Sequence, residues 1–300
     1  MAKRDEAVSE VVPLRRARRT LEGVPEVSFS DGRPQVRAVE PERVAAVDLS
    51  DKQKVWLMLG DGGTGKTTEV RFLVGRMVEQ GRGGALLAAL DPGLRSLASW
   101  FSGVEEPPSS EASQAARWLR ELFEALMEEP GPAVLDFGGG GHVALSRVVE
   151  ASEPGSVHTM LEGRGLGLVA CYTLSPRIDD LAVLQHFEAA KFQPEATLLL
   201  LNTGKADPTQ DAEEAFEAVR RHSAYRRAVD RGAVPVWMPT LEADVMQEIE
   251  AKRLSFVMAR DGQIPPRAAF PPVGGFKRSM VTRWLARMEE AHRPVATWLP

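Results

Sequence analysis

The pattern of apolar and polar positions along the chain changes at about residue 54. Before that point, residues 1–50 contain few apolar residues with a regular period and hold scattered Pro and Gly. After it, short apolar runs alternate with stretches in which apolar residues recur every three or four positions, the spacings typical of strands and of amphipathic helices. The apolar runs do not alternate with polar residues, so they predict strands that are buried on both faces.

The expected elements follow one another as repeated strand–helix units. The strands are expected at residues 55–59, 85–90, 133–137, 165–174, 196–201 and 233–238. The helices are expected at 69–80, at 110–129 with Ser110 as its cap, from near His142, at 175–192, at 211–229 as one helix or a pair, at 241–252 and at 276–291. Residues 262–275 are rich in Pro and Gly and are expected to be irregular. This order predicts an α/β fold in which a mostly parallel, twisted sheet has helices on both faces, as a single main domain.

A phosphate-binding motif lies between the first expected strand and helix. Gly60, Gly65, Lys66 and Thr67 occupy the fixed positions of G-x-x-x-x-G-K-[ST]. Glycines let the backbone N–H groups surround phosphate oxygens, and the amino end of the following helix adds partial positive charge. Lys66 can reach the β- and γ-phosphates, and the Thr67 hydroxyl can ligate Mg²⁺. The predicted nucleotide-binding residues are Gly60, Gly62, Gly63, Thr64, Gly65, Lys66, Thr67 and Thr68.

The motif predicts a P-loop NTPase and a division of the chain into three parts. Residues 1–50 are interpreted as a basic, flexible N-terminal arm, residues 51–260 as the P-loop ATPase domain, and residues 261–300 as a Pro/Gly-rich segment followed by a C-terminal helix. Turnover also needs a carboxylate near Mg²⁺ and a group that orients the attacking water. Asp91 and Asp136 each close an expected strand, at the sheet edge where ligands of such folds bind. We therefore expect Lys66, Asp91 and Asp136 to be catalytic, with Thr67 and Asp136 as metal ligands.

Composition restricts the classes of partner. The 300-residue chain has a formal charge of −5, so nothing global indicates a nucleic-acid binder. Its first 20 residues carry six basic and three acidic side chains, a local net charge of +3. This arm could contact DNA, an acidic protein or an anionic membrane, or be a solvated arm.

Cys171 is the single cysteine, so no internal disulfide can form. The start lacks a secretory core and no apolar run of about 18 residues occurs, so a cytoplasmic location is expected.

Six segments follow one another in a recognisable order across roughly residues 52–260. They are Gly62–Thr68, Leu90–Arg95, Val134–Asp136 with the following glycines, Thr173–Asp180, Leu200–Asn202, and Met238–Thr240 with Asp244. As an ordered set they resemble the MinD/ParA group of P-loop ATPases, in which the first three correspond to the deviant phosphate loop, the first switch and the second switch.

The resemblance implies ATP and Mg²⁺ as ligands and a nucleotide-dependent switch in intracellular positioning, plasmid or chromosome partitioning, or plasmid transfer. By the same resemblance, Asp91 would position water, Asp136 would sense Mg²⁺ and the γ-phosphate, and Asn202 would contact adenine. A rival signal, Gly204-Lys205-Ala206-Asp207, partly matches the guanine-binding pattern [NT]-K-x-D, but its first position is Gly. Adenine is therefore the expected base.

Two positions depart from the family pattern. The family's signature lysine, which crosses a nucleotide-sandwiched homodimer, would fall on Asp61, and the first switch has Ala89 in place of an aspartate. The resemblance implies a nucleotide-dependent homodimer as a possible partner state; with Asp61, either this side chain points to solvent or the dimer is absent or built differently. An aspartate cannot donate to phosphate and repels it. The alternatives to a switch ATPase are therefore a nucleotide-binding module with little hydrolysis, favoured by Asp61 and Ala89, and a small-molecule kinase or ligase on the same scaffold.

The C-terminal helix is expected to dock on the domain or to bind a partner. Glu289 and Glu290 argue against binding of this helix to a membrane.

Overall fold

A parallel sheet forms the centre of the computed structural model, which describes residues 47–81, 84–90, 97–138, 140–153 and 155–300. In these residues the sheet has six strands in the order β2-β3-β1-β4-β5-β6, and every pairing is parallel. The strands are β1 (Gln53–Leu59), β2 (Leu86–Ala89), β3 (Ala133–Asp136), β4 (Leu166–Leu174), β5 (Ala196–Asn202) and β6 (Val234–Met238). The predicted α/β class is confirmed: the sheet is parallel and has helices on both faces.

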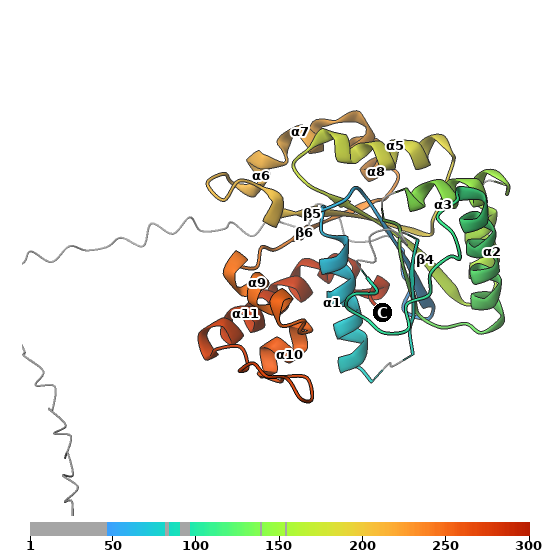
Figure 1. Cartoon of the computed structure of the whole chain (residues 1–300). Helices are drawn as coiled ribbons and strands as arrows, with labels where there is room; N and C mark the ends of the chain where they lie inside the picture. Colours follow the sequence, from blue (N-terminus) through green and yellow to red (C-terminus); the bar gives the residue numbers. More distant parts are fainter. Residues whose placement is uncertain (1–46, 82–83, 91–96, 139, 154) are drawn as a thin grey trace, which may run out of the picture. The chain divides into compact units, whose positions relative to one another are not determined.

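Two layers of helices cover the sheet (Figure 1). One layer contains α2 (Ala112–Glu128), α3 (Gly141–Glu150), α4 (Ser156–Glu162), α5 (Leu181–Ala189), α7 (Glu217–Arg221) and α8 (Ser223–Asp230). The other contains α1 (Lys66–Glu79), α9 (Ala243–Ala251), α10 (Phe256–Asp261), α11 (Gly275–Ala291) and the 3₁₀ segment η3 (Arg293–Trp298). The remaining short elements are η1 (Ile178–Asp180), η2 (Thr203–Lys205) and α6 (Ala212–Ala215).

The central strand shows why the apolar runs lack alternation. In β1, Val55 and Leu57 contribute to one apolar core, while Trp56 and Met58 contribute to the other. All four side chains are buried. Successive side chains of a strand point to opposite faces, so a strand covered on both sides must be apolar throughout.

Several element boundaries differ from expectation for local reasons. The side chain of Glu111, not Ser110, caps α2, because it accepts hydrogen bonds from the N–H groups of Ser113 (2.9 Å) and Gln114 (3.0 Å). The helix expected at 175–192 begins later, because the Asp180 carboxylate accepts hydrogen bonds from the N–H and hydroxyl of Ser175 and holds an irregular turn. Residues 211–229 fold into three short helices, and α4 and α10 are additional elements that the sequence pattern did not predict.

The C-terminal segment packs into the core on the α1 side of the sheet. Trp284 of α11 is buried, and its Nε1 donates to the Pro239 carbonyl at 2.7 Å. Trp298 is 1% exposed and lies against β1, where the Trp56 Nε1 donates to the Trp298 carbonyl at 2.9 Å. Phe276, the second residue of α11, is by contrast 94% exposed.

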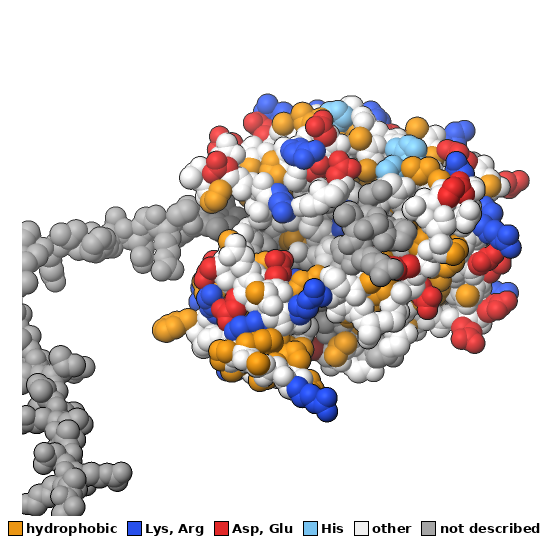
Figure 2. Space-filling model, viewed as in Figure 1, with side chains coloured by type: hydrophobic (Ala, Val, Ile, Leu, Met, Phe, Trp, Pro, Cys, Tyr) orange, Lys and Arg blue, Asp and Glu red, His pale blue; other side chains and the backbone are white. Residues whose placement is uncertain are grey.

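The predicted arm lies almost wholly outside the described residues, which begin at residue 47. Within the described part of the chain, no helix is both long and apolar enough to span a membrane. On the face seen in Figure 2, basic and acidic side chains of the described residues are interspersed over the surface, and apolar ones gather over α10 and the segment leading to α11.

Candidate functional site

The predicted phosphate-binding loop (residues 60–67), called the phosphate loop below, joins the carboxyl end of β1 to the amino end of α1. Three of its glycines adopt positive φ: Gly60 (137°), Gly63 (79°) and Gly65 (113°). A Cβ on Gly60 would lie 2.6 Å from the Thr173 hydroxyl, and a Cβ on Gly65 would lie 2.3 Å from the Asn202 amide nitrogen. Two of the motif's glycines are thus required both by backbone conformation and by close neighbours.

Lys66 opens α1 and folds back over the loop. Its side chain is largely buried, and Nζ donates to the carbonyl oxygens of Gly60 (2.7 Å) and Asp61 (2.9 Å). The next residues, Thr67 and Thr68, are half-buried in the first turn of α1. The ammonium group is therefore held against the turn whose N–H groups could surround a phosphate.

Buried polar side chains from two other strands brace the loop. The Thr64 hydroxyl lies 2.6 Å from the hydroxyl of Thr173 in β4 and donates to the Asp61 carbonyl at 2.8 Å. Asn202, the last residue of β5, donates from Nδ2 to the Thr64 carbonyl (2.8 Å), and its Oδ1 accepts from the Gly204 N–H (3.0 Å). Both ends of the Asn202 amide are thus engaged by the protein, which gives this side chain a role in positioning the loop.

Asp136 lies next to the phosphate loop because β3 is the neighbour of β1. The register pairs Asp136 with Met58 of β1 and with Ala89 of β2, and its side chain is buried. After β3, Gly141 lets α3 approach closely, since a Cβ there would lie 2.9 Å from the Leu90 carbonyl oxygen. Asp91, the other predicted acid, lies outside the described residues.

A histidine that sequence reasoning missed also lies near the loop. His142, in the first turn of α3, has its pKa lowered by burial and by the neighbouring His186, whose ring packs edge-on at 5.6 Å. Asp61 raises this pKa and Lys66 lowers it, which places His142 within electrostatic reach of the loop. The imidazole is therefore neutral at pH 7 and able both to donate and to accept a hydrogen bond. The available signal was its position directly after the glycines that follow Asp136.

The loops after β5 and β6 meet at the same edge of the sheet. The Thr203 hydroxyl donates to the Met238 carbonyl (2.8 Å) and lies 3.0 Å from the Thr240 hydroxyl. In the rival guanine-binding segment, Lys205 and Asp207 are exposed. Asp207 accepts from the hydroxyl and the N–H of Thr209, and these hydrogen bonds lower the pKa of its carboxyl group. The sheet thus brings together the loop, Asp136 and Asn202, which are far apart in sequence.

No protein-family model and no curated protein matches this sequence. Among solved structures, the chain is similar to chloroplast FtsY from Physcomitrella patens, at 17% identity and a TM-score of 0.42, over 68% of this chain and 65% of that one. It is also similar to the signal recognition particle receptor FtsY from Elizabethkingia anophelis, at 16% identity and a TM-score of 0.37, over 78% of this chain and 66% of that one. A third similar structure is FlhF complexed with GMPPNP and Mg²⁺, at 12% identity and a TM-score of 0.37, over 64% of this chain and 70% of that one.

This chain spans slightly less than two thirds of the two FtsY chains. With TM-scores and identities this low, the likeness assigns no function to the chain.

Proposed function

We propose that this protein is a nucleotide-dependent switch of the MinD/ParA type that binds ATP with Mg²⁺ and hydrolyses it slowly or on contact with a partner. The observation that carries the proposal is the arrangement of one loop: glycines in the left-handed region, Lys66 Nζ bonded across the loop, and Asp136 on the adjacent strand. Loop N–H groups, a lysine and a carboxylate together match the needs of a triphosphate and its cation.

Each residue has a distinct task in this proposal. The loop N–H groups and the amino end of α1 bind the β- and γ-phosphates, and Lys66 exchanges its carbonyl partners for phosphate oxygens. The Thr67 hydroxyl in the first turn of α1 and the Asp136 carboxylate at the end of β3 are hard oxygen donors, a donor set that fits Mg²⁺. Held by these two residues, Mg²⁺ would supply charge neutralisation on the phosphates, and hydrolysis would be an in-line attack of water.

ATP is the proposed nucleotide, with adenine bound near the loops after β5 and β6. Asn202 supports the site by holding the Thr64 carbonyl, and its contact with adenine stays a prediction. Equilibrium binding should therefore be measured with fluorescent analogues of both ATP and GTP. Preference for GTP would reject adenine and leave the P-loop assignment intact.

The first test replaces Lys66 by Ala. We expect at least a tenfold loss of affinity for ATP, since the side chain supplies the one positive charge of the motif, a contribution of about 1.4 kcal/mol or more. Lys277→Ala is the matched control, because that lysine pairs with Asp244 and Glu248 and lies on α11. ATP affinity equal to that of the wild type in a folded Lys66→Ala protein would refute the proposal.

A second candidate function is nucleotide binding with little turnover. Asp61 favours this function, because an aspartate stands where the resembled family has its signature lysine. The Lys66 ammonium also donates a hydrogen bond to the backbone oxygen of Asp61. Single-turnover hydrolysis of bound ATP, measured with and without DNA or lipid vesicles, separates the two functions. The absence of turnover under every condition would favour the binding module.

A further inference from the structure

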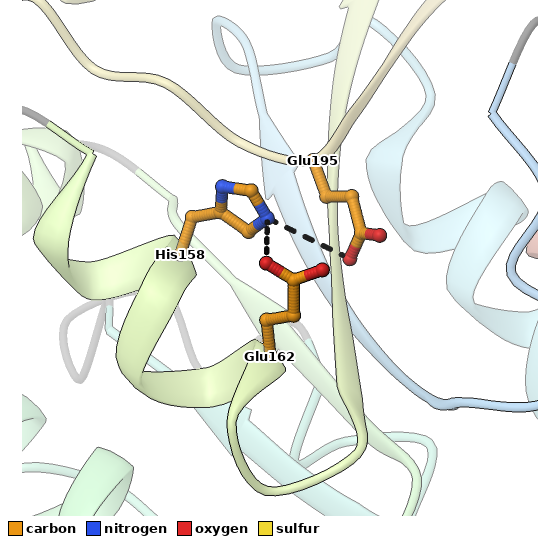
Figure 3. Close-up of side chains that lie close together, drawn as sticks. All are labelled: His158, Glu162 and Glu195. Carbon is orange, nitrogen blue, oxygen red and sulfur yellow. Dashed lines mark ion pairs between the residues drawn. The ribbon is translucent and has the colours of Figure 1, made fainter.

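Four charged or ionisable side chains meet at the edge of the sheet opposite the phosphate loop. Lys52 comes directly before β1 and Glu195 directly before β5, so both lie at the amino ends of strands. His158 and Glu162 are one turn apart on α4 and point toward Glu195 (Figure 3). The cluster therefore joins one helix to the beginnings of two strands.

The spacing of three atoms matches a metal ligand set better than a hydrogen-bonded set. His158 Nε2 lies 3.4 Å from Glu162 Oε2 and 3.8 Å from Glu195 Oε2, and the three atoms are all within 4.8 Å of one another. Hydrogen bonds between such groups are shorter, at about 2.9 Å. Ligands bound to a tetrahedral zinc ion at about 2.1 Å are separated by about 3.4 Å.

Two of these atoms are buried polar atoms without a hydrogen-bond partner. His158 Nε2 and Glu195 Oε2 are inaccessible to solvent, and neither forms a hydrogen bond within the described residues. The two atoms lie within ion-pair distance of each other, at 3.8 Å, which is too long for a hydrogen bond. Burying polar atoms without a hydrogen bond is costly, and a bound ion or water would remove this cost. Both atoms face the space between His158 and the two carboxylates (Figure 3).

Lys52 orients the carboxylates without filling this space. Its Nζ donates to the other oxygens, Glu162 Oε1 (3.0 Å) and Glu195 Oε1 (2.5 Å). The other two oxygens, Glu162 Oε2 and Glu195 Oε2, are thereby left facing His158. Hydrogen bonds from outer groups commonly orient ligating carboxylates in this way. Two carboxylates against one ammonium also leave a net charge of −1 when the imidazole is neutral, which attracts a cation.

We propose that His158, Glu162 and Glu195 form a binding site for a divalent transition-metal ion. One imidazole nitrogen and two carboxylate oxygens suit zinc-like ions, and water completes the coordination from the side of the half-exposed Glu162. A bound ion fastens α4 to the start of β5, at the sheet edge opposite the predicted phosphate loop. The site is therefore independent of the function proposed above.

The test is calorimetric titration of the untagged, nucleotide-free full chain with Zn²⁺. We expect one equivalent to bind with a micromolar Kd, and His158→Gln to weaken it at least tenfold. His222→Asn is the matched control, because it removes another histidine and supplies a residue that also caps α8. This control should bind Zn²⁺ like the wild type.

Glu162→Gln keeps the test decisive if His158→Gln does not fold. Its side chain is 47% exposed, so the fold tolerates the change, and circular dichroism in EDTA verifies this. It should weaken Zn²⁺ at least tenfold and reduce the rise in Tm that Zn²⁺ gives the wild type. Wild-type protein that binds no Zn²⁺ below millimolar concentration, or folded variants that bind it unchanged, would overturn the proposal.

Discussion

At the scale of single residues, Gly65 is the position where loop conformation and packing coincide. We expect Gly65→Ala to lower the free energy of unfolding by about 2–4 kcal/mol, because it strains a φ of 113° and displaces Asn202 from the Thr64 carbonyl. Gly62→Ala is the matched control, since its Cβ would meet nothing within 4 Å. That change should stay within about 0.5 kcal/mol. Urea unfolding of both variants measures this, and equal effects would contradict the assigned role of Gly65.

At the scale of elements, buried polar contacts attach α1 to the C-terminal part of the chain. Glu69 of α1 and His292, directly after α11, are fully buried, with Oε1 and Nε2 2.9 Å apart. Arg71 of α1 is enclosed by the rings of Trp100 (3.7 Å) and Phe256 (4.2 Å), and burial lowers the pKa of its guanidinium to about 10. The helix that follows the phosphate loop is therefore coupled to α10 and α11.

The pair of Glu69 and His292 predicts a pH-dependent stability. Burial lowers the pKa of His292, but the Glu69 carboxylate and the Met288 carbonyl raise it more, so the folded-state value lies above the ordinary 6.5. The protonated form then stabilises the fold fully below about pH 6.5, and this stabilisation is lost as the pH rises through the folded-state pKa. We expect the free energy of unfolding to fall by up to about 1.4 kcal/mol per pH unit in that window.

Urea unfolding at a series of pH values from 6 upward, at about half-unit steps, measures this dependence. His292→Gln removes the titrating group, so its profile over the same range should be flatter than that of the wild type. If the stability of the wild type rises with pH over this range, protonation of His292 does not stabilise the fold.

At the scale of the whole molecule, the C-terminal residues complete the core. Trp298 is 1% exposed, and its Nε1 donates to the Val47 carbonyl at 2.9 Å. We expect Trp298→Ala to cost about 3–5 kcal/mol of unfolding free energy. The control is Phe276→Ala, because this aromatic is 94% exposed and should change stability by less than about 0.5 kcal/mol. Thermal and urea unfolding compare the stabilities of the two variants. A Trp298→Ala variant as stable as the wild type would show that the C-terminal segment does not contribute to the core.

Assembly is the second property at this scale. Since Asp61 replaces the lysine by which the resembled family crosses its dimer, we expect the mass in solution to be that of a monomer with and without ATP and Mg²⁺. Light scattering coupled to size-exclusion chromatography measures it. A doubled mass with ATP would indicate a nucleotide-dependent homodimer that does not need the lysine.

The sequence by itself determined the fold class and the motif. Strands buried on both faces must be apolar without alternation, so β1 and β4 could be located within one or two residues. The glycine spacing of the phosphate loop follows from backbone requirements that act within a few residues, and it too is visible in the chain. Boundaries such as the start of α2 and α5 were missed, because single side chains, Glu111 and Asp180, decide them through local hydrogen bonds.

Only the tertiary structure decided which distant residues meet. The strand order places β3 beside β1, so Asp136 lies at the loop, and β4 and β5 bring Thr173 and Asn202 to brace it. No sequence motif marks His142 near the loop. The same is true of the cluster at the opposite edge, formed by His158, Glu162 and Glu195. Periodicity reports the environment of each residue but not its neighbours across the sheet, because strand order is chosen by packing of the whole chain.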